Sequence, residues 1–271
     1  MTIKAAVFGN PIAQSKSPRM HNHWLKKLGI DGEYIAQLAP LDGFEAEVRR
    51  LMSEGFAGAN VTMPFKQEAL AIADASTEIA RMIGAANTLT FSNGKIHADN
   101  TDGFGFGNNI LSQIPDWNVR GSHIVIGAGG AAGAIVAWLL SQGASEIIIV
   151  NRSVERAQEV AKLSGKIHVI TWGELPANLS GKTTLINTSS LGMNGENDIK
   201  IDFSKADQEM IVNDIVYSPL ETGLLRDAKS AGLRTVDGLG MLLWQGRPGF
   251  REWFGQEAPE IDDELRELML K

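Results

Sequence analysis

The stretch that decides the fold reads His123-Ile124-Val125-Ile126-Gly127-Ala128-Gly129-Gly130-Ala131-Ala132. An apolar strand leads into the pattern Gly-x-Gly-x-x-Ala, and a helix is predicted to follow. In a dinucleotide-binding loop of this kind, Gly127 allows the tight turn and Gly129 lets the backbone approach a pyrophosphate. Ala132 lets the helix pack closely on the strand, and the helix N-terminus offers amides and a positive dipole to the anion. The alternative is a glycine-rich turn that serves only packing.

Apolar strands recur at regular intervals after this loop, and helical segments fill most of the gaps between them. This spacing predicts a doubly wound α/β domain of the Rossmann type. The strands stop after Val236, and two predicted helices follow, Leu239–Phe254 and Asp262–Leu270, which we expect to return to the first domain. The predicted strands are Ile124–Ile126, Ile147–Val150, Val169–Ile170, Thr184–Ile186, Met210–Ile215 and Thr235–Val236.

The end of the second strand of this domain indicates which dinucleotide binds. An NAD-binding unit usually carries Asp or Glu there, about 20 residues beyond the glycines, to hold the ribose hydroxyls. Here the strand ends in Asn151-Arg152-Ser153, and Arg156 follows one helical turn later. Two cations at a helix N-terminus repel each other and oppose the helix dipole, and a bound 2′-phosphate would relieve both effects. The pattern therefore favours NADP, with two solvated arginines as the alternative.

The first hundred residues also alternate strands and helices, which predicts an open, mostly parallel α/β layer. Ser17, followed by Pro18, is predicted to cap a helix that runs to Leu28. Ser92-Asn93-Gly94 predicts a hairpin. The predicted strands are Ile3–Phe8, Glu33–Leu38, Phe56–Thr62, Thr88–Phe91 and Lys95–Ala98, and the other predicted helices are Phe44–Ser53 and a segment from Pro64 through Ala73.

Four polar clusters in this first part lie where a predicted strand ends or a predicted helix begins. In an open α/β sheet such positions share the edge where ligands bind, so the clusters predict a site for a polyol or a carboxylate. Taken singly, each has a plain structural explanation: Ser17 caps a helix, Asn87 caps a turn and Lys66 is a solvated charge. The clusters are Ser15-Lys16-Ser17-Pro18, Asn60-Val61-Thr62-Met63-Pro64-Phe65-Lys66, Asn87-Thr88 and Asp99-Asn100-Thr101-Asp102-Gly103.

Composition excludes several other classes of protein. The chain has 271 residues, a formal net charge of −7 and no cysteine. The acidic balance argues against a nucleic-acid partner, and the missing cysteines exclude disulfides, thiolate metal sites and cysteine nucleophiles. The start, Met1 to Asn10, lacks the pattern of a signal peptide, and the apolar run Ile135–Leu140 is too short to span a membrane. We expect a cytoplasmic protein that binds small molecules, with no metal and no membrane partner.

As a set, these motifs resemble the shikimate dehydrogenase family over nearly the whole chain. The resemblance implies two domains: residues 1–102, completed by residues 239–271, would bind the substrate, and residues 103–238 would bind NADP. It implies an NADP-dependent oxidoreductase that reduces 3-dehydroshikimate to shikimate in aromatic amino-acid biosynthesis. The motifs that complete the match are Gly9-Asn10-Pro11-Ile12, Gly58-Ala59-Asn60-Val61-Thr62, Gly84-Ala85-Ala86-Asn87-Thr88, Asn187-Thr188-Ser189, Gly192-Met193 and Asp237-Gly238-Leu239-Gly240-Met241 with Gln245.

The resemblance also implies a role for each matching residue. Ser15 and Ser17 would hold the substrate carboxylate, with Tyr217 near it. The residues expected at the ring hydroxyls are Asn60, Thr62, Asn87, Asp102 and Gln245, with Lys66 and Asp102 paired at the reacting hydroxyl. The residues expected at the cofactor are Gly127, Ala128, Gly129, Gly130, Ala131, Asn151, Arg152, Ser153, Arg156, Ile215 and Gly238.

The chemistry of this reaction needs a proton donor. Hydride transfer to a ketone creates an alkoxide, so a general acid must lie close to it. Lys66 is the candidate donor and Asp102 the group that orients it, although the sequence leaves open which of the two moves the proton. Two other functions remain open: a quinate/shikimate dehydrogenase that uses NAD, and a non-catalytic NADPH-binding sensor. We expect a monomer or a homodimer.

Overall fold

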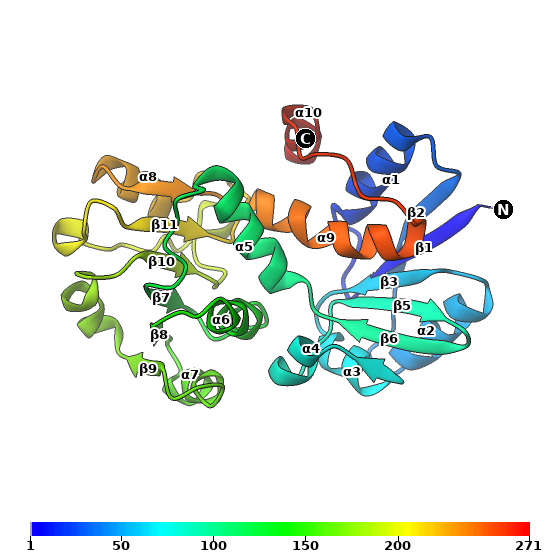
Figure 1. The fold of residues 1–271 in the computed structure, drawn as a ribbon, viewed down its shortest axis with the longest axis horizontal. Coiled ribbons are helices and arrows are strands. Elements are labelled where there is room, and N and C mark those ends of the chain that lie inside the picture. The colour runs from blue at the N-terminus through cyan, green and yellow to red at the C-terminus, as the bar shows by residue number, and fades with distance from the viewer. Residues whose placement is uncertain (1) are drawn as a thin grey trace. The chain divides into compact units, whose positions relative to one another are not determined.

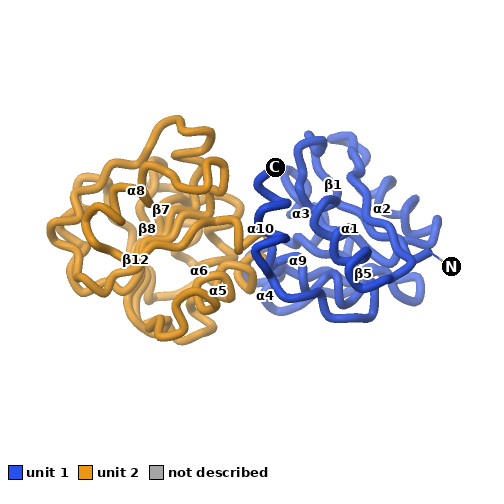
Figure 2. Tube along the Cα trace, turned by 90° about the horizontal axis from the view of Figure 1, so that it is seen from above, with its two compact units in different colours: residues 1–101, 243–271 blue, residues 102–242 orange. Residues whose placement is uncertain are grey.

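Two six-stranded sheets organise the chain in the computed structural model, which describes residues 2–271 (Figure 1). Met1, where the predicted first domain begins, lies outside the described residues. Each sheet forms the centre of one compact unit (Figure 2). Unit 1 comprises residues 1–101 and 243–271, and unit 2 comprises residues 102–242.

The sheet of unit 1 has the strand order β2-β1-β3-β5-β6-β4. β1 pairs in parallel with β2 and β3, and β4 pairs in parallel with β6, whereas β5 is antiparallel to both β3 and β6. The predicted mostly parallel layer is therefore confirmed, with the predicted hairpin as its antiparallel part. Its elements are β1 (Ile3–Gly9), α1 (Ser17–Leu28), β2 (Gly32–Leu38), α2 (Phe44–Ser53), β3 (Gly58–Val61), α3 (Lys66–Ala71), β4 (Ala75–Ser76), α4 (Glu78–Ile83), β5 (Thr88–Ser92) and β6 (Lys95–Asp99).

Aromatic side chains fill both faces of this sheet. On one face Phe44 of α2 packs edge-on against Phe8 of β1, with ring centroids 5.5 Å apart. On the other face Trp253 donates its indole N–H to the Leu89 carbonyl oxygen (3.0 Å). A Cβ at Gly58 would lie 2.2 Å from that indole nitrogen. Glycine is therefore needed at the start of β3 for the helix that carries Trp253, residues 239–254, to pack against this strand.

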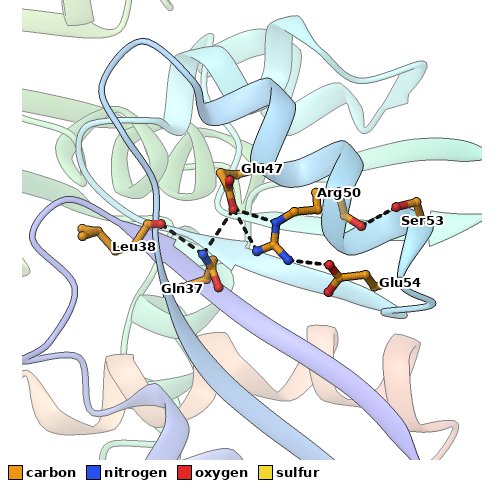
Figure 3. A network of polar contacts seen from close by, with 6 residues as sticks. All are labelled: Gln37, Leu38, Glu47, Arg50, Ser53 and Glu54. Carbon is orange, nitrogen blue, oxygen red and sulfur yellow. Dashed lines mark hydrogen bonds and ion pairs between the residues drawn. The ribbon is translucent and has the colours of Figure 1, made fainter.

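An exposed network joins α2 to β2 (Figure 3). Arg50 forms ion pairs with Glu47 (2.9 Å) and Glu54 (2.5 Å), and Gln37 also donates to Glu47 (3.2 Å). Such exposed pairs contribute little to stability, typically about 0–1 kcal/mol each. The apolar face of α2, with Phe44, Val48 and Leu51 buried, therefore holds the helix in place.

The sheet of unit 2 is parallel throughout, with the strand order β12-β11-β10-β7-β8-β9. This is the predicted doubly wound arrangement, in which the order reverses on either side of β7. Its elements are α5 (Asp102–Gln113), β7 (Ser122–Ile126), α6 (Ala132–Ser141), β8 (Glu146–Val150), α7 (Val154–Ala161), β9 (Ile167–Ile170), the 3₁₀ helices η1 (Trp172–Asn178), η2 (Met193–Gly195) and η3 (Phe203–Lys205), β10 (Thr184–Asn187), β11 (Ile211–Asp214), α8 (Gly223–Ser230) and β12 (Arg234–Val236).

Alternate residues of the same strands enter two separate cores. Val125 and Ile149 pack with helices α5 and α6, whereas Ile124, Ile126 and Val150 pack with the segments around η1 and α8. Both faces of the sheet are therefore covered, which is why consecutive apolar residues occur in strands such as β7 and β8. α9 (Leu239–Phe254) begins in unit 2 and continues into unit 1, and α10 (Asp263–Leu270) belongs to unit 1, so the C-terminal helices return as predicted.

Two local predictions were wrong. Lys16, not Ser17, is the N-cap of α1, and no side chain caps that helix. α3 ends at Ala71 rather than Ala73, because Ile72 is its C-cap and the Asp74 N–H already donates to the Ile96 carbonyl oxygen in β6 (2.9 Å). Asp102 begins unit 2 and is the first residue of the twelve-residue helix α5.

Replacing Gly107 with Ala should destabilise unit 2, because α5 and α6 approach closely at this glycine. A Cβ there would lie 2.0 Å from the ring of Trp138. Overpacking of this kind costs about 1–3 kcal/mol, which denaturant titration should detect as a lower free energy of unfolding. Gly165→Ala is the matched control, because nothing lies within 4 Å of its added Cβ. Equal stabilities of the two variants would contradict the close packing.

Candidate active site

Strand register collects several of the predicted substrate residues at one edge of the unit 1 sheet. Asn60 of β3 lies opposite Thr88 of β5, and Thr88 lies opposite Asp99 of β6. Because β5 runs antiparallel to β3, the start of β5 lies beside the end of β3. Thr62 follows β3, and its N–H donates to the Phe8 carbonyl oxygen in β1 (2.9 Å). The edge where β1 and β3 end therefore carries the polar clusters.

The buried amide of Asn87 is the centre of a hydrogen-bonded network at this edge. Its Oδ1 accepts from the Thr101 N–H (2.9 Å) and from the Thr88 hydroxyl (2.9 Å). Its Nδ2 donates to Oε1 of Gln245 (3.4 Å), and the Thr101 hydroxyl donates to the Gln245 carbonyl oxygen (2.8 Å). The fold thus brings together Asn87 and Gln245, two predicted substrate residues that are 158 positions apart.

Asn60 joins the same network on its other side. Its Nδ2 donates to the Asn87 carbonyl oxygen (3.1 Å) and to the Thr88 hydroxyl (3.2 Å). Its Oδ1 accepts from the hydroxyl of Tyr34 (2.6 Å), and burial raises the pKa of that phenol well above its ordinary value. Sequence reasoning missed Tyr34, because a tyrosine inside the predicted strand Glu33–Leu38 gives no signal that separates it from ordinary core.

Ser15 lies in the loop between β1 and α1, Ser17 is the first residue of α1, and both residues are half-buried. Oγ of Ser15 accepts from the Ser17 N–H (3.4 Å), and the Ser17 hydroxyl does not cap the helix. The side chain of Lys16, between them, donates to the Met269 carbonyl oxygen at the end of α10. Both serines therefore lie at the start of α1, where the helix dipole favours an anion. Their contact with a carboxylate stays a prediction.

Lys66 and Asp102, the two predicted catalytic residues, each begin a helix. Lys66 is the first residue of α3, and its carbonyl oxygen accepts from the Ala86 N–H (2.8 Å), next to Asn87. Asp102 is the first residue of α5 and is 3% exposed. It follows directly on Thr101, which belongs to the Asn87 network. The pairing of Lys66 with Asp102 stays a prediction.

The glycine loop of unit 2 has the geometry that its sequence predicts. Gly127 has a φ of 106°, which favours glycine, and a Cβ there would lie 2.7 Å from Oγ1 of Thr188. By contrast, nothing lies within 4 Å of a Cβ built at Gly129 or Gly130, so their backbone faces open space. The buried Ala132 begins α6, and no side chain caps that helix. The loop therefore leaves space for a pyrophosphate at the start of α6, where the helix dipole favours an anion.

The end of β8 places two arginines beside the start of α7. Arg152 and Arg156 are both exposed. Ser153 is the N-cap of α7: its Oγ accepts from the Arg156 N–H (3.4 Å) and donates to the Glu155 carboxylate (2.8 Å). Asn151 in turn donates to the Ser153 carbonyl oxygen (2.7 Å). The Ser153 hydroxyl already donates its proton to Glu155. The exposed side chains of Arg152 and Arg156 are therefore the groups at this position that suit a phosphate.

A second buried network lies at the carboxyl edge of the unit 2 sheet. Asp214, at the end of β11, accepts from Nδ2 of Asn187 (2.9 Å), from the Val216 N–H (3.0 Å) and from the Thr222 hydroxyl (2.7 Å). Burial raises the pKa of Asp214 to about 6, with a small contribution from Asp198, while these three donors oppose the shift. The network fixes the chain that continues from β11.

The segment after β11 carries the remaining predicted residues of unit 2. Gly238 approaches this segment so closely that a Cβ would lie 2.2 Å from the Ile215 carbonyl oxygen. Ile215 and Gly238, both predicted at the cofactor, are therefore in direct backbone proximity. Tyr217 is half-buried, and burial raises the pKa of its phenol. Close packing against Ile215 therefore requires glycine at position 238, whether or not Gly238 also contacts the cofactor.

The stability of this network should depend on pH in a way that Asp214→Asn removes. The folded pKa of about 6 lies above the ordinary value of 3.8, so the folded state binds the proton more tightly between these values. The contribution of this group to stability is therefore greatest below pH 4 and is lost as the pH rises through 6. Relative to the variant, the wild type should lose up to about 1.4 kcal/mol per pH unit in that window. The measurement is denaturant unfolding of both proteins from pH 4 to 7, and a constant difference would contradict the shift.

No helix within residues 2–271 is long and apolar enough to cross a membrane. Nor does any group of three or more His, Cys, Asp or Glu side chains in that range come together as a metal site would require.

Three family models match successive parts of the chain. The model described as "Shikimate dehydrogenase substrate binding domain" matches residues 7–89. The model described as "Shikimate / quinate 5-dehydrogenase" matches residues 111–218. The model described as "Shikimate 5'-dehydrogenase C-terminal domain" matches residues 238–263.

Individual relatives agree with these models. The chain is 48% identical to the shikimate dehydrogenase (NADP(+)) of Paracoccus denitrificans, over 98% of this chain and 95% of that protein. The crystal structure of shikimate 5-dehydrogenase from Thermus thermophilus with NADP(H) and shikimate has a TM-score of 0.87 at 32% identity, covering 99% and 98% of the two chains. Quinate dehydrogenase from Corynebacterium glutamicum with NAD has a TM-score of 0.90 at 26% identity, covering 99% of each chain. On these matches and its own motifs, the chain belongs to the shikimate dehydrogenase family.

Proposed function

We propose that this chain catalyses the reversible, NADPH-dependent reduction of 3-dehydroshikimate to shikimate. The observation that carries the proposal is the network of Asn60, Asn87 and Gln245, three family substrate residues that the fold gathers at one sheet edge. Amides placed in this way suit a ligand with several hydroxyl groups, because each amide offers a donor and an acceptor. The chain is an NADP-dependent oxidoreductase by family, as the sequence predicted.

The substrate's charged group fits the loop at the start of α1. Ser15 and Ser17 provide two hydroxyl donors, and α1 adds its N-terminal dipole. We assign the carboxylate to these serines, with Tyr217 near it. The ring hydroxyls are assigned to Asn60, Thr62, Asn87, Asp102 and Gln245. An anion with adjacent hydroxyl groups is the class of ligand that matches this set.

The cofactor residues fit NADP. The open backbone at Gly129 and Gly130 leaves space for the pyrophosphate, and Arg152 and Arg156 carry the charge that a 2′-phosphate needs. The strand ends without an acid at residues 151–153, the place where NAD-binding units hold the ribose hydroxyls. When bound, NADPH supplies the hydride.

The protein's own groups must then supply the proton. We assign the general acid to Lys66, which delivers a proton to the oxygen of the reduced carbonyl, and we assign Asp102 to orient it. Lys66 begins the short helix α3, and its carbonyl oxygen accepts from the Ala86 N–H (2.8 Å), which holds its backbone next to Asn87. Because Asp102 is buried, its carboxylate is held in one place.

Two coarser expectations complete the proposal. We propose a cytoplasmic enzyme, in keeping with a biosynthetic reaction that uses NADPH, and a monomer or a homodimer. The alternative is an NAD-dependent enzyme that oxidises quinate, as the name of one structural relative suggests. Ser17 argues for shikimate instead, and Arg152 and Arg156 argue for NADP.

Lys66→Ala should lower kcat by about 10²–10⁴, the range for loss of a positioned acid–base group. The KM for shikimate should change much less, because the serines and the amide network remain. Steady-state oxidation of shikimate measures both constants. Lys95→Ala is the control, because Lys95 is an exposed lysine at the opposite end of β6 and should leave both constants unchanged. A kcat near that of the wild type would remove Lys66 from the mechanism.

Turnover of shikimate and of quinate, each with NADP and with NAD, tests the whole assignment. We expect the highest kcat/KM for shikimate with NADP. Arg152→Ala should raise the KM for NADP roughly 10- to 150-fold, as expected for one charge-assisted phosphate contact, and should leave NAD almost unchanged.

Arg120→Ala is the matched control for this assay. Arg120 is exposed but precedes β7, at the amino end of the strand, so its loss should affect neither cofactor. Added salt should weaken NADP more than NAD, because screening acts on the extra phosphate charge. Equal efficiency of the wild type with both cofactors, or equal losses in Arg152→Ala, would overturn the cofactor assignment.

A further inference from the structure

Tyr34 lies outside every motif in the sequence, yet its hydroxyl reaches the substrate edge. The residue lies in β2 and is 1% exposed, so its ring is closed off from any ligand. Its hydroxyl donates to Oδ1 of Asn60 at 2.6 Å, across 26 positions of sequence. Any effect of Tyr34 on the site must therefore pass through Asn60.

Two neighbouring residues of α1 hold Tyr34 in place. The ring of His21 stacks on the ring of Tyr34, with centroids 4.0 Å apart and planes within 5°. Asn22 brackets the backbone of Tyr34: its Nδ2 donates to the carbonyl oxygen (2.8 Å), and its Oδ1 accepts from the N–H (3.0 Å). Ring and backbone are thus both fixed by the helix that begins at Ser17.

His21 is an unusual choice for this position. It is fully buried, and both of its ring nitrogens lack a hydrogen-bond partner within residues 2–271. An unpartnered buried polar group costs stability, so an apolar ring would be less costly. Burial lowers the pKa of His21 to about 3, so the stack joins two uncharged rings. The stack leaves the Tyr34 hydroxyl directed at Asn60.

The orientation of the Asn60 amide follows from its fixed partners. The Asn87 carbonyl oxygen can only accept, so the group that faces it must be Nδ2 of Asn60. The second N–H faces the Thr88 hydroxyl. Oδ1 therefore faces Tyr34, whose phenol must donate. Both N–H groups of Asn60 are already in hydrogen bonds, so its side chain can form a further hydrogen bond only as an acceptor, through Oδ1.

We propose that Tyr34 is a positioning residue that holds Asn60 with Oδ1 available as the acceptor for a ring hydroxyl of the substrate. This inference rests on the proposed function, in which Asn60 binds such a hydroxyl. Oδ1 of Asn60 then accepts a hydrogen bond only from a ligand group that donates one. A substrate oxygen that carries no hydrogen is therefore disfavoured at this position.

Tyr34→Phe tests the proposal, because it keeps the stack on His21 and removes only the hydroxyl. The KM for shikimate should rise about five- to tenfold, the effect of one lost hydrogen bond, while kcat and the KM for NADP stay within about twofold. Trp253→Phe is the matched control: it removes another buried hydrogen bond from the same aromatic core without touching Asn60. A KM for shikimate that stays unchanged in Tyr34→Phe, or rises equally in Trp253→Phe, would overturn the inference.

A double-mutant cycle separates positioning from general destabilisation. Because Tyr34 acts through Asn60, adding Tyr34→Phe to Asn60→Ala should change the KM for shikimate by less than about twofold. Multiplying effects would show an independent, merely structural role. If the wild type does not turn over shikimate, the proposed function is refuted. If the wild type is active but the KM values do not change as stated, only the role of Tyr34 is refuted.

Spectroscopy of the unmutated protein gives a readout that does not depend on how the variants fold. The chain has two tyrosines, Tyr34 and Tyr217, so incorporation of 3-fluorotyrosine should give two ¹⁹F resonances. Tyr217→Phe assigns them. Saturation with shikimate should shift the Tyr34 resonance, although the ring is closed to ligand, because Asn60 transmits the contact. A Tyr34 resonance that shikimate leaves unmoved would overturn the inference.

Discussion

Apolar side chains cover both faces of each six-stranded sheet, so a ligand can reach the backbone only where the strands end. In unit 2 the alternation of Ile124 and Val125 sends successive residues into opposite cores. In unit 1 Phe8 faces α2 while Tyr34 faces α1 and α9. Polar side chains that bind a ligand have to gather at the carboxyl edges, and both halves of the proposed site follow from this constraint.

An asparagine lies at the centre of the polar network in each unit. Asn87 joins Thr88, Thr101 and Gln245, and Asn187 joins Asp214 and the residues around it. A primary amide suits these buried places because it donates and accepts without carrying a charge. Buried polar networks are stable only when their members are paired, and a paired network has few alternative arrangements. The paired side chains at this edge of the unit 1 sheet therefore have few alternative arrangements.

Two glycines allow α9 to pack closely against its neighbours in unit 1. Trp253 of α9 lies against Gly58 of β3, two residues before Asn60, and Gly246 leaves room for Met20 of α1. A side chain at Gly58 would lie 2.2 Å from both the Leu89 carbonyl oxygen and the Trp253 indole nitrogen, so it would push α9 away from β3. These contacts hold α9, which carries Gln245, against β3, which carries Asn60.

The sequence by itself determined the two α/β layers, the glycine loop at Gly127 and the preference for NADP, because these depend on short-range patterns: apolar runs, turn residues and the missing acid after β8. It did not reveal Tyr34 or the Asn187–Asp214 network, and it placed the cap of α1 at Ser17 instead of Lys16. Those features depend on strand register and helix packing, which join residues tens of positions apart. Only the tertiary structure decided which polar groups form hydrogen bonds with one another, because the fold brings these distant residues together.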